Sequence, residues 1–300
     1  MPSREMQEVL SLLAERQRAA AAAPAPSVDE QRASFEPAGE EHPLPGDVVV
    51  AAVTARGVPA YWLDPPGVRP DRVLLFLHGG GFRLGSLASD GELASRLGRS
   101  AGMRVLFLEY RRAPEHPYPA AIDDVRAAWR WLVDDQALTP SSLAIAGDSA
   151  GGGLAVALLV SLRDAHDPLP SAAVLMSPTV DLTGSGRSMT ERVDQDLIST
   201  PGLLAELASD YLAGTDPRTP SASPLFASLA GLPPLLIQVG TADLLLSDAE
   251  RLAASASEAG VDVRLEVGEG LPHVYPLMAE TPEAQEATDR SGAFLRSLVR

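Results

Sequence analysis

The chain has 300 residues, of which 45% are hydrophobic and 21% are charged, so its composition is that of an ordinary globular protein. It has no cysteine, which excludes a disulfide framework, a thiolate nucleophile and any cysteine-ligated zinc or iron–sulfur site. Its formal net charge is −16 and every basic residue is an arginine, which argues against nucleic acid or an anionic membrane as a partner.

The N-terminal residues predict an amphipathic helix, because Met6, Val9, Leu10 and Leu13 follow the i, i+3, i+4, i+7 spacing. The stretch has no apolar run like that of a signal peptide, and no segment reaches the length of a membrane span. We therefore expect a soluble, cytoplasmic protein. The stretch AAAAAPAPS (residues 19–27) ends the helix and is the best linker candidate.

The middle of the chain alternates strands with helices. Two paired strands are expected at 47–55 and 58–64, followed by short, nearly continuous apolar runs at 72–81, 103–110, 141–149, 171–178 and 233–243. Continuous apolarity is typical of strands buried on both faces of a parallel sheet. Helical segments are expected between them, at about 88–99, 119–135, 150–164 and 247–259. This alternation predicts a doubly wound α/β domain.

Residues 181–230 interrupt the alternation, since they have helical periodicity but no strong strand. We interpret them as an insertion that forms a helical cap together with residues 1–45, over a core made of 46–180 and 231–300. Residues 1–45 are called the first cap segment below, and residues 181–230 the second cap segment. The run VDVRLEV (261–267) reads as the last, edge strand of the sheet. Its alternation would allow pairing with a copy into a homodimer, although Arg264 and Glu266 would equally protect the edge from pairing.

A cluster of glycines surrounds Ser149 in the stretch AGDSAGGG (146–153). A phosphate-binding P-loop would need a lysine, which the chain lacks, and a dinucleotide site would need the spacing G-x-G-x-x-G. A flexible linker would not join a buried strand to an apolar helix. The remaining interpretation is the motif G-x-S-x-G at a strand-to-helix junction, where a sharp turn presents the hydroxyl of Ser149 as a nucleophile.

A serine nucleophile needs a base and an acid that orients it, and these follow in the order Ser, Asp/Glu, His in α/β hydrolases. His273 is the only one of the five histidines that lies beyond the last core strand, so it is the predicted base. Asp243 directly follows the preceding strand and is the predicted acid, with Asp248 in the next helix as the fallback.

A second glycine run, HGGGF (78–82), ends an earlier buried strand. Its glycines would let the backbone approach the reacting carbonyl group, so that the amides of Gly80, Gly81 and Ala150 form an oxyanion hole. His78 is interpreted as a residue that holds this loop rather than as a base.

Three sequence blocks in this order, HGGGF (78–82), EYRRAPEHPYPAAIDD (109–124) and GDSAGGGLA (147–155), resemble the bacterial hormone-sensitive-lipase-like esterases of the α/β-hydrolase superfamily. The resemblance covers about residues 45–300. It implies a mostly parallel sheet of about eight strands, with helices on both faces and a helical cap. It also implies hydrolysis of carboxylic esters, usually short-chain, without a metal or cofactor, by Ser149, Asp243 and His273.

Two details of the resemblance bear on particular residues. The family's acid usually stands in D-P-L, whereas this chain has Asp243-Leu244-Leu245, and Asp248 matches an acidic position that often follows. Tyr110, Arg111 and Glu115 resemble residues that brace the active-site loops.

The sequence thus predicts a serine carboxylesterase that acts on short- to medium-chain esters through an acyl-enzyme on Ser149. Phe82 and cap residues would line the substrate pocket, although each is equally consistent with core packing; the cap candidates are Met6, Phe35, Leu203 and Tyr211. Hydrolysis of lactones or amides by the same triad stays open. A small-molecule binding protein on a hydrolase scaffold is disfavoured, because all three triad residues are present.

Overall fold

A computed structural model describes residues 1–21, 23, 26–35 and 42–300 of the chain. Its centre is one sheet of eight strands in the order β1-β2-β4-β3-β5-β6-β7-β8. The strands are β1 (Val49–Ala55), β2 (Val58–Asp64), β3 (Arg69–Leu77), β4 (Met103–Leu108), β5 (Leu143–Asp148), β6 (Ala173–Met176), β7 (Leu235–Ala242) and β8 (Val263–Pro272). β1 and β2 pair antiparallel, and β3 to β8 run parallel.

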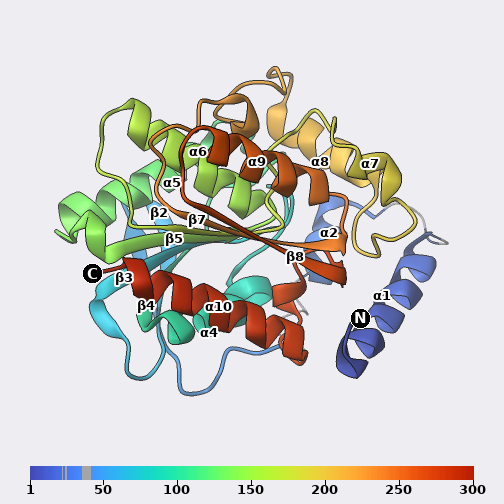
Figure 1. Ribbon diagram of the computed structural model, residues 1–300, viewed down its shortest axis with the longest axis horizontal. Helices are drawn as coiled ribbons and strands as arrows, with labels where there is room; N and C mark the ends of the chain where they lie inside the picture. Colours follow the sequence, from blue (N-terminus) through green and yellow to red (C-terminus); the bar gives the residue numbers. More distant parts are fainter. Residues whose placement is uncertain (22, 24–25, 36–41) are drawn as a thin grey trace.

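Helices cover both faces of the sheet, as Figure 1 shows. One face carries α5 (Ala120–Arg130), α6 (Ala150–Asp164) and α9 (Leu246–Glu258), and the other carries α4 (Leu87–Ala101) and α10 (Pro282–Leu298). Successive residues of the central strands enter opposite cores: Leu75 and Leu77 pack with α5 and α6, whereas Leu74 and Phe76 pack with α4. The expectation of a parallel sheet buried on both faces is therefore confirmed.

The five apolar runs of the sequence form β3 to β7, and the four expected helices form α4, α5, α6 and α9. Among these helices the largest difference is that the one expected to reach residue 135 ends as α5 at Arg130 and continues as a single π-helical turn over Trp131–Asp135. Among the strands, β3 begins at Arg69 and ends at Leu77, and β8 extends to Pro272, beyond the expected end at residue 267.

The remaining helices lie at the end of the sheet to which β7 and β8 point (Figure 1). They are α1 (Arg4–Ala21) and α2 (Val28–Phe35) in the first cap segment, and α7 (Ser188–Glu191) and α8 (Pro201–Leu212) in the second. The linker expected at 19–27 lies partly outside the described residues, as do 36–41 of the first cap segment. Because the carboxyl ends of parallel strands meet at one edge, these helices face the turns that follow β3, β5 and β7.

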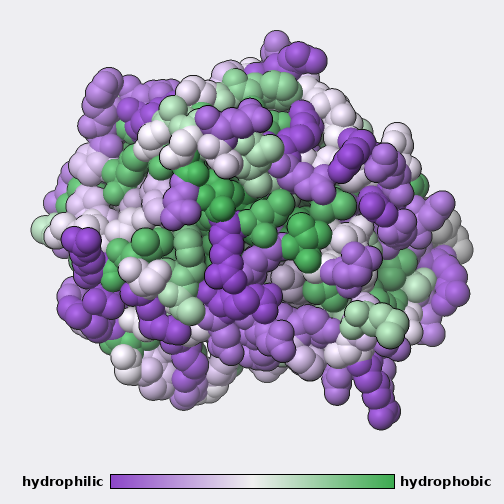
Figure 2. Space-filling view, viewed as in Figure 1, coloured by the Kyte–Doolittle hydropathy of each residue, from purple (hydrophilic) through white to green (hydrophobic). Residues whose placement is uncertain are grey.

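β8 is an edge strand of the sheet, as expected. Figure 2 shows hydrophobic surface between α9 and α10, crossed by hydrophilic side chains. Val267 is 45% exposed there, and Glu266 of the same strand pairs with Arg264 and Arg290. Within the described ranges, no helix is both long and apolar enough to cross a bilayer.

Candidate active site

Ser149 stands alone in the turn between β5 and α6, with φ 49° and ψ −116°. This left-handed conformation is strained for a residue with a side chain, and it persists because the surrounding backbone leaves no alternative. A Cβ on Gly147 would overlap the carbonyl of Gly151, and one on Gly151 would overlap the carbonyl oxygen of Leu77. The glycines around Ser149 are therefore required by close backbone approach, and their effect is to push the serine side chain out above the sheet.

The Ser149 side chain meets His273, which follows β8, and His273 in turn meets Asp243, which follows β7. The Ser149 hydroxyl donates to Nε2 of His273 at 3.0 Å, and the Nδ1–H of His273 donates to both carboxylate oxygens of Asp243 at 3.0 Å each. The contact with the carboxylate favours the tautomer protonated on Nδ1, which leaves Nε2 free to accept. Ser149 and His273 are each 8% exposed, and Asp243 is fully buried. The three predicted residues thus form one triad-like network.

Negative charges near His273 outweigh the effect of burial and favour the positively charged imidazole. Burial lowers the pKa of His273, but the negative charges of Asp243 and Asp196 and the hydrogen bond to Asp243 raise it above its ordinary value. The histidine is consequently a stronger base than a free imidazole.

The fallback acid, Asp248, has a different environment. Its Oδ2 accepts hydrogen bonds from the amides of Val180 and Asp181, 3.0 and 2.9 Å away, and burial raises its pKa to about 7. It therefore supports the chain after β6, while Asp243 is the carboxylate that the structure brings to His273.

The HGGGF loop turns sharply after β3, with positive φ at Gly80 (92°), Gly81 (62°) and Phe82 (62°). Within the described part of the chain, the amides of Gly80, Gly81 and Ala150 have no protein acceptor. Free amides beside a serine hydroxyl, with Ala150 at the N-terminus of α6, suit a developing negative charge.

His78 fixes this loop from below, as expected. Its ring is buried, stacks on Tyr110 at 4.1 Å, and donates from Nδ1 to the carbonyl of Gly79 at 2.9 Å. Burial lowers the pKa of His78 to about 3, so the ring stays neutral. The Tyr110 hydroxyl donates to the carbonyl of His78 at 2.8 Å, which agrees with a bracing role.

The other two bracing candidates form ion pairs. Arg111 binds Asp124 of α5 at 2.7 Å, and Glu115 binds Arg32 of α2 at 2.7 Å. Glu115 therefore links the core to the first cap segment.

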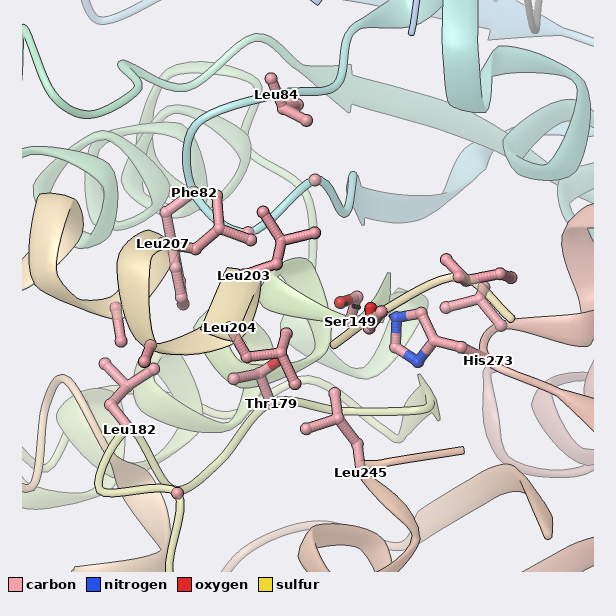
Figure 3. Close-up of a pocket in the computed structure, with 18 of the residues that line it drawn as sticks. Phe82, Leu84, Ser149, Thr179, Leu182, Leu203, Leu204, Leu207, Leu245 and His273 are labelled. Atoms are coloured by element: carbon pink, nitrogen blue, oxygen red, sulfur yellow. Dashed lines mark hydrogen bonds between the residues drawn. The ribbon is translucent and has the colours of Figure 1, made fainter. Parts of the chain in front are cut away.

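A cavity of about 670 Å³ opens beside Ser149 and His273. Figure 3 shows the side chains around it, with leucines of α8 facing Ser149 across the space. Three of the predicted pocket residues line it, namely Phe82, Phe35 and Leu203. Further lining residues, which the sequence analysis did not single out, are Leu13, Leu84, Thr179, Leu182, Leu204, Leu207 and Leu245. The repeated leucines of α8 were the available signal, but a leucine stripe equally predicts core packing.

The other two predicted pocket residues, Met6 and Tyr211, do not line the cavity. Met6 is fully buried in a cluster with Leu271, Tyr275 and Met278, where α1 packs on the end of the core, and of these residues only Met278 also lines the cavity. Tyr211 stacks behind the ring of Phe82 at 3.8 Å and supports the wall from outside. Among the residues described, no group of three His, Asp or Glu side chains is placed to hold a metal ion.

Comparison with known proteins agrees with this geometry. A family model of the alpha/beta hydrolase fold matches residues 74–277. The chain is 47% identical to an acetyl-hydrolase of Streptomyces hygroscopicus, over 84% of this chain and 83% of that protein. It is 37% identical to the carboxylesterase NlhH of Mycobacterium tuberculosis, over 80% of this chain and 77% of that one. The crystal structure of an esterase from the bacterial hormone-sensitive lipase family superimposes with a TM-score of 0.95, at 43% identity over 100% of both chains.

The fold and the triad-like network define a hydrolase of the α/β-hydrolase class. Within that class the chain belongs to the bacterial hormone-sensitive-lipase family of esterases, and it is a carboxylic ester hydrolase.

Proposed function

We propose that the protein hydrolyses short- to medium-chain carboxylic esters through an acyl-enzyme on Ser149. The observation that carries the proposal is the continuous chain of hydrogen bonds from Ser149 through His273 to Asp243, at the floor of an apolar cavity. The Streptomyces relative is named an acetyl-hydrolase, which supports a small acyl group.

In the first half of the reaction, Oγ of Ser149 attacks the ester carbonyl carbon while Nε2 of His273 takes the hydroxyl proton. The carbonyl oxygen becomes an oxyanion, which the amides of Gly80, Gly81 and Ala150 would bind. The carbon–oxygen bond to the alcohol then breaks, and His273 returns the proton to the leaving alkoxide oxygen. Asp243 stabilises the transient imidazolium and holds its tautomer.

In the second half, His273 takes a proton from water, and the resulting hydroxide attacks the acyl carbon. The oxyanion forms again in the same place, the bond to Oγ breaks, and the proton passes to Ser149. The carboxylic acid leaves, and the free enzyme is restored. Both halves of the reaction use only protein side chains and amides, the ester and water. The cap segments would form the wall that selects the acyl and alcohol groups.

The first test compares wild type with Ser149→Ala on nitrophenyl esters from acetyl to decanoyl. We expect wild-type activity to peak at the short chains and the variant to lose about 10⁶-fold in kcat, since the nucleophile is removed. Ser257→Ala is the matched control, because Ser257 is exposed on α9. Activity of Ser149→Ala at the wild-type level would contradict the proposal, and inertness of wild type on every ester would direct the search to lactones.

We also propose that β8 can pair with its copy in a homodimer. The exposed edge and the hydrophobic surface beside it support pairing, while the charged residues on the strand oppose it. Light scattering of the purified protein decides between a monomer and a dimer. The cytoplasmic location stays a prediction.

A further inference from the structure

The backbone N–H and C=O of Leu244, the residue directly after Asp243, both form hydrogen bonds with the second cap segment. Its N–H donates to Oδ2 of Asp196 at 2.9 Å, and its carbonyl accepts from the hydroxyl of Ser188 at 2.5 Å.

Asp196 is buried, with 1% of its surface exposed, and its carboxylate is bound by backbone amides on two sides. Besides Leu244, it accepts from the amides of Ile198 and Ser199 at 2.8 Å each. Ile198 and Ser199 line the cavity, and the Asp196 carbonyl accepts from the side chain of Gln17 in α1. Asp196 thus joins three regions: its carboxylate contacts the acid turn and the cavity wall, and its backbone carbonyl contacts the first cap segment.

The side-chain oxygens of Asp196 accept hydrogen bonds from the backbone amides of Ile198, Ser199 and Leu244. Burial of a carboxylate is costly, and these donors favour its charged form. Two ionisable groups also act on it: a positive charge on His273 favours the carboxylate form, and the charge of Asp243 opposes it.

We propose that Asp196 is a positioning residue of the catalytic network: it fixes the turn that carries Asp243 and sets a second negative charge near His273. The inference rests on the proposed function, because it assigns the acid and base roles to those two residues. It makes the second cap segment part of the machinery that tunes the base, in addition to forming the cavity wall.

The electrostatic side of the proposal agrees with the direction of the pKa values. Burial and the charge of Asp243 raise the pKa of Asp196 above its ordinary value, although the charge on His273 and the backbone donors act to lower it. Asp196 in turn raises the pKa of His273, after the larger effects of burial and Asp243. Because His273 must be neutral to accept a proton, activity falls as pH drops through its pKa. Loss of the Asp196 charge lowers that pKa and moves the acid limb to lower pH.

The test is Asp196→Asn, which keeps the size of the side chain but turns an N–H₂ toward one of its donors. We expect kcat on nitrophenyl acetate to fall about tenfold to hundredfold, with KM within about twofold, because the acid is displaced rather than the cavity. The acid limb of kcat/KM is expected to move down by about one pH unit. Its position does not depend on the fraction of protein that is folded.

Asp194→Asn is the matched control, since it removes the same charge from an exposed position two residues away. It is expected to leave both kcat and the acid limb unchanged. A fall in kcat with an unmoved acid limb would overturn the proposal and leave Asp196 a packing role only. So would an unaltered kcat in Asp196→Asn.

Asp243→Asn, measured beside these variants, separates this inference from the proposed function. If Asp243→Asn loses activity by orders of magnitude while Asp196→Asn behaves as wild type, the inference is wrong and the triad stands. If Asp243→Asn keeps wild-type activity, the triad assignment is wrong, and the inference falls with it.

Discussion

The turns at the ends of β3 and β5 and the helix α8 face the same cavity, but different interactions hold them. In the turns, backbone lies directly on backbone: a Cβ at Gly151 has no room beside Leu77 and His78. Helix α8 is held by side chains, with Arg83, directly after the HGGGF loop, donating to Glu206, Asp210 and, in α2, Gln31. The reacting groups therefore stand where the chain allows one conformation, and the cavity wall stands where side chains can be exchanged.

The largest expected effect is on kcat, and it comes from comparing two glycine-to-alanine substitutions, one in a turn packed backbone on backbone and one in α8. Gly151→Ala forces β3 and α6 apart, so we expect kcat to fall by at least about hundredfold. Gly202→Ala, in the first turn of α8, meets only the Thr200 hydroxyl at 4.0 Å. We expect unchanged kcat there and a small rise in thermal stability, since alanine favours the helix. Wild-type kcat in Gly151→Ala would break the comparison.

A smaller effect is expected where the two regions are joined by charge. Arg83 is 1% exposed, whereas its partners Glu206 and Asp210 are partly open to water. We expect Arg83→Met to lower the free energy of unfolding by about 2 kcal/mol and to raise KM several-fold, because α8 loses its link to the loop. Thermal denaturation and ester kinetics measure both. Arg4→Met, at an exposed pair with Glu8, is the control that should change neither. An unchanged KM in Arg83→Met would show that α8 is held by its leucines alone.

The smallest effect on activity separates the cavity wall from the outer packing of the cap. Leu204→Ala enlarges the cavity, so we expect the ratio of kcat/KM for octanoyl over butyryl esters to rise about fourfold, the effect of bringing one further methylene into contact. Met6→Ala removes a buried side chain outside the cavity. It should cost about 2 kcal/mol of stability and leave that ratio unchanged. A changed ratio in Met6→Ala would mean that the packing of α1 outside the cavity also shapes the cavity wall.

The core could be predicted from the sequence because its signals are local. Continuous apolar runs predicted β3 to β7, and the order Ser149, Asp243, His273 matched the strand ends that carry them. The glycines around Ser149 occur at a fixed spacing because a side chain at these positions would collide with the neighbouring strand and helix backbones. The pairing of β1 with β2 was also expected, because the strands predicted at 47–55 and 58–64 are separated by only two residues.

The cap could be predicted only as helical. Whether Met6, Tyr211 or Leu204 faces the cavity depends on how each helix is rotated and docked, and that is set by contacts with residues far away in the chain, such as Arg83 with α8. The same holds for Asp196, which lies 48 residues before the Leu244 amide that it binds. Local periodicity fixes which residues share a helix face, but it carries no information on what that face meets. The turns after β3 and β5 are thus determined by neighbouring residues. The cavity wall and the link from Asp196 to the acid turn, by contrast, form only when distant segments pack together.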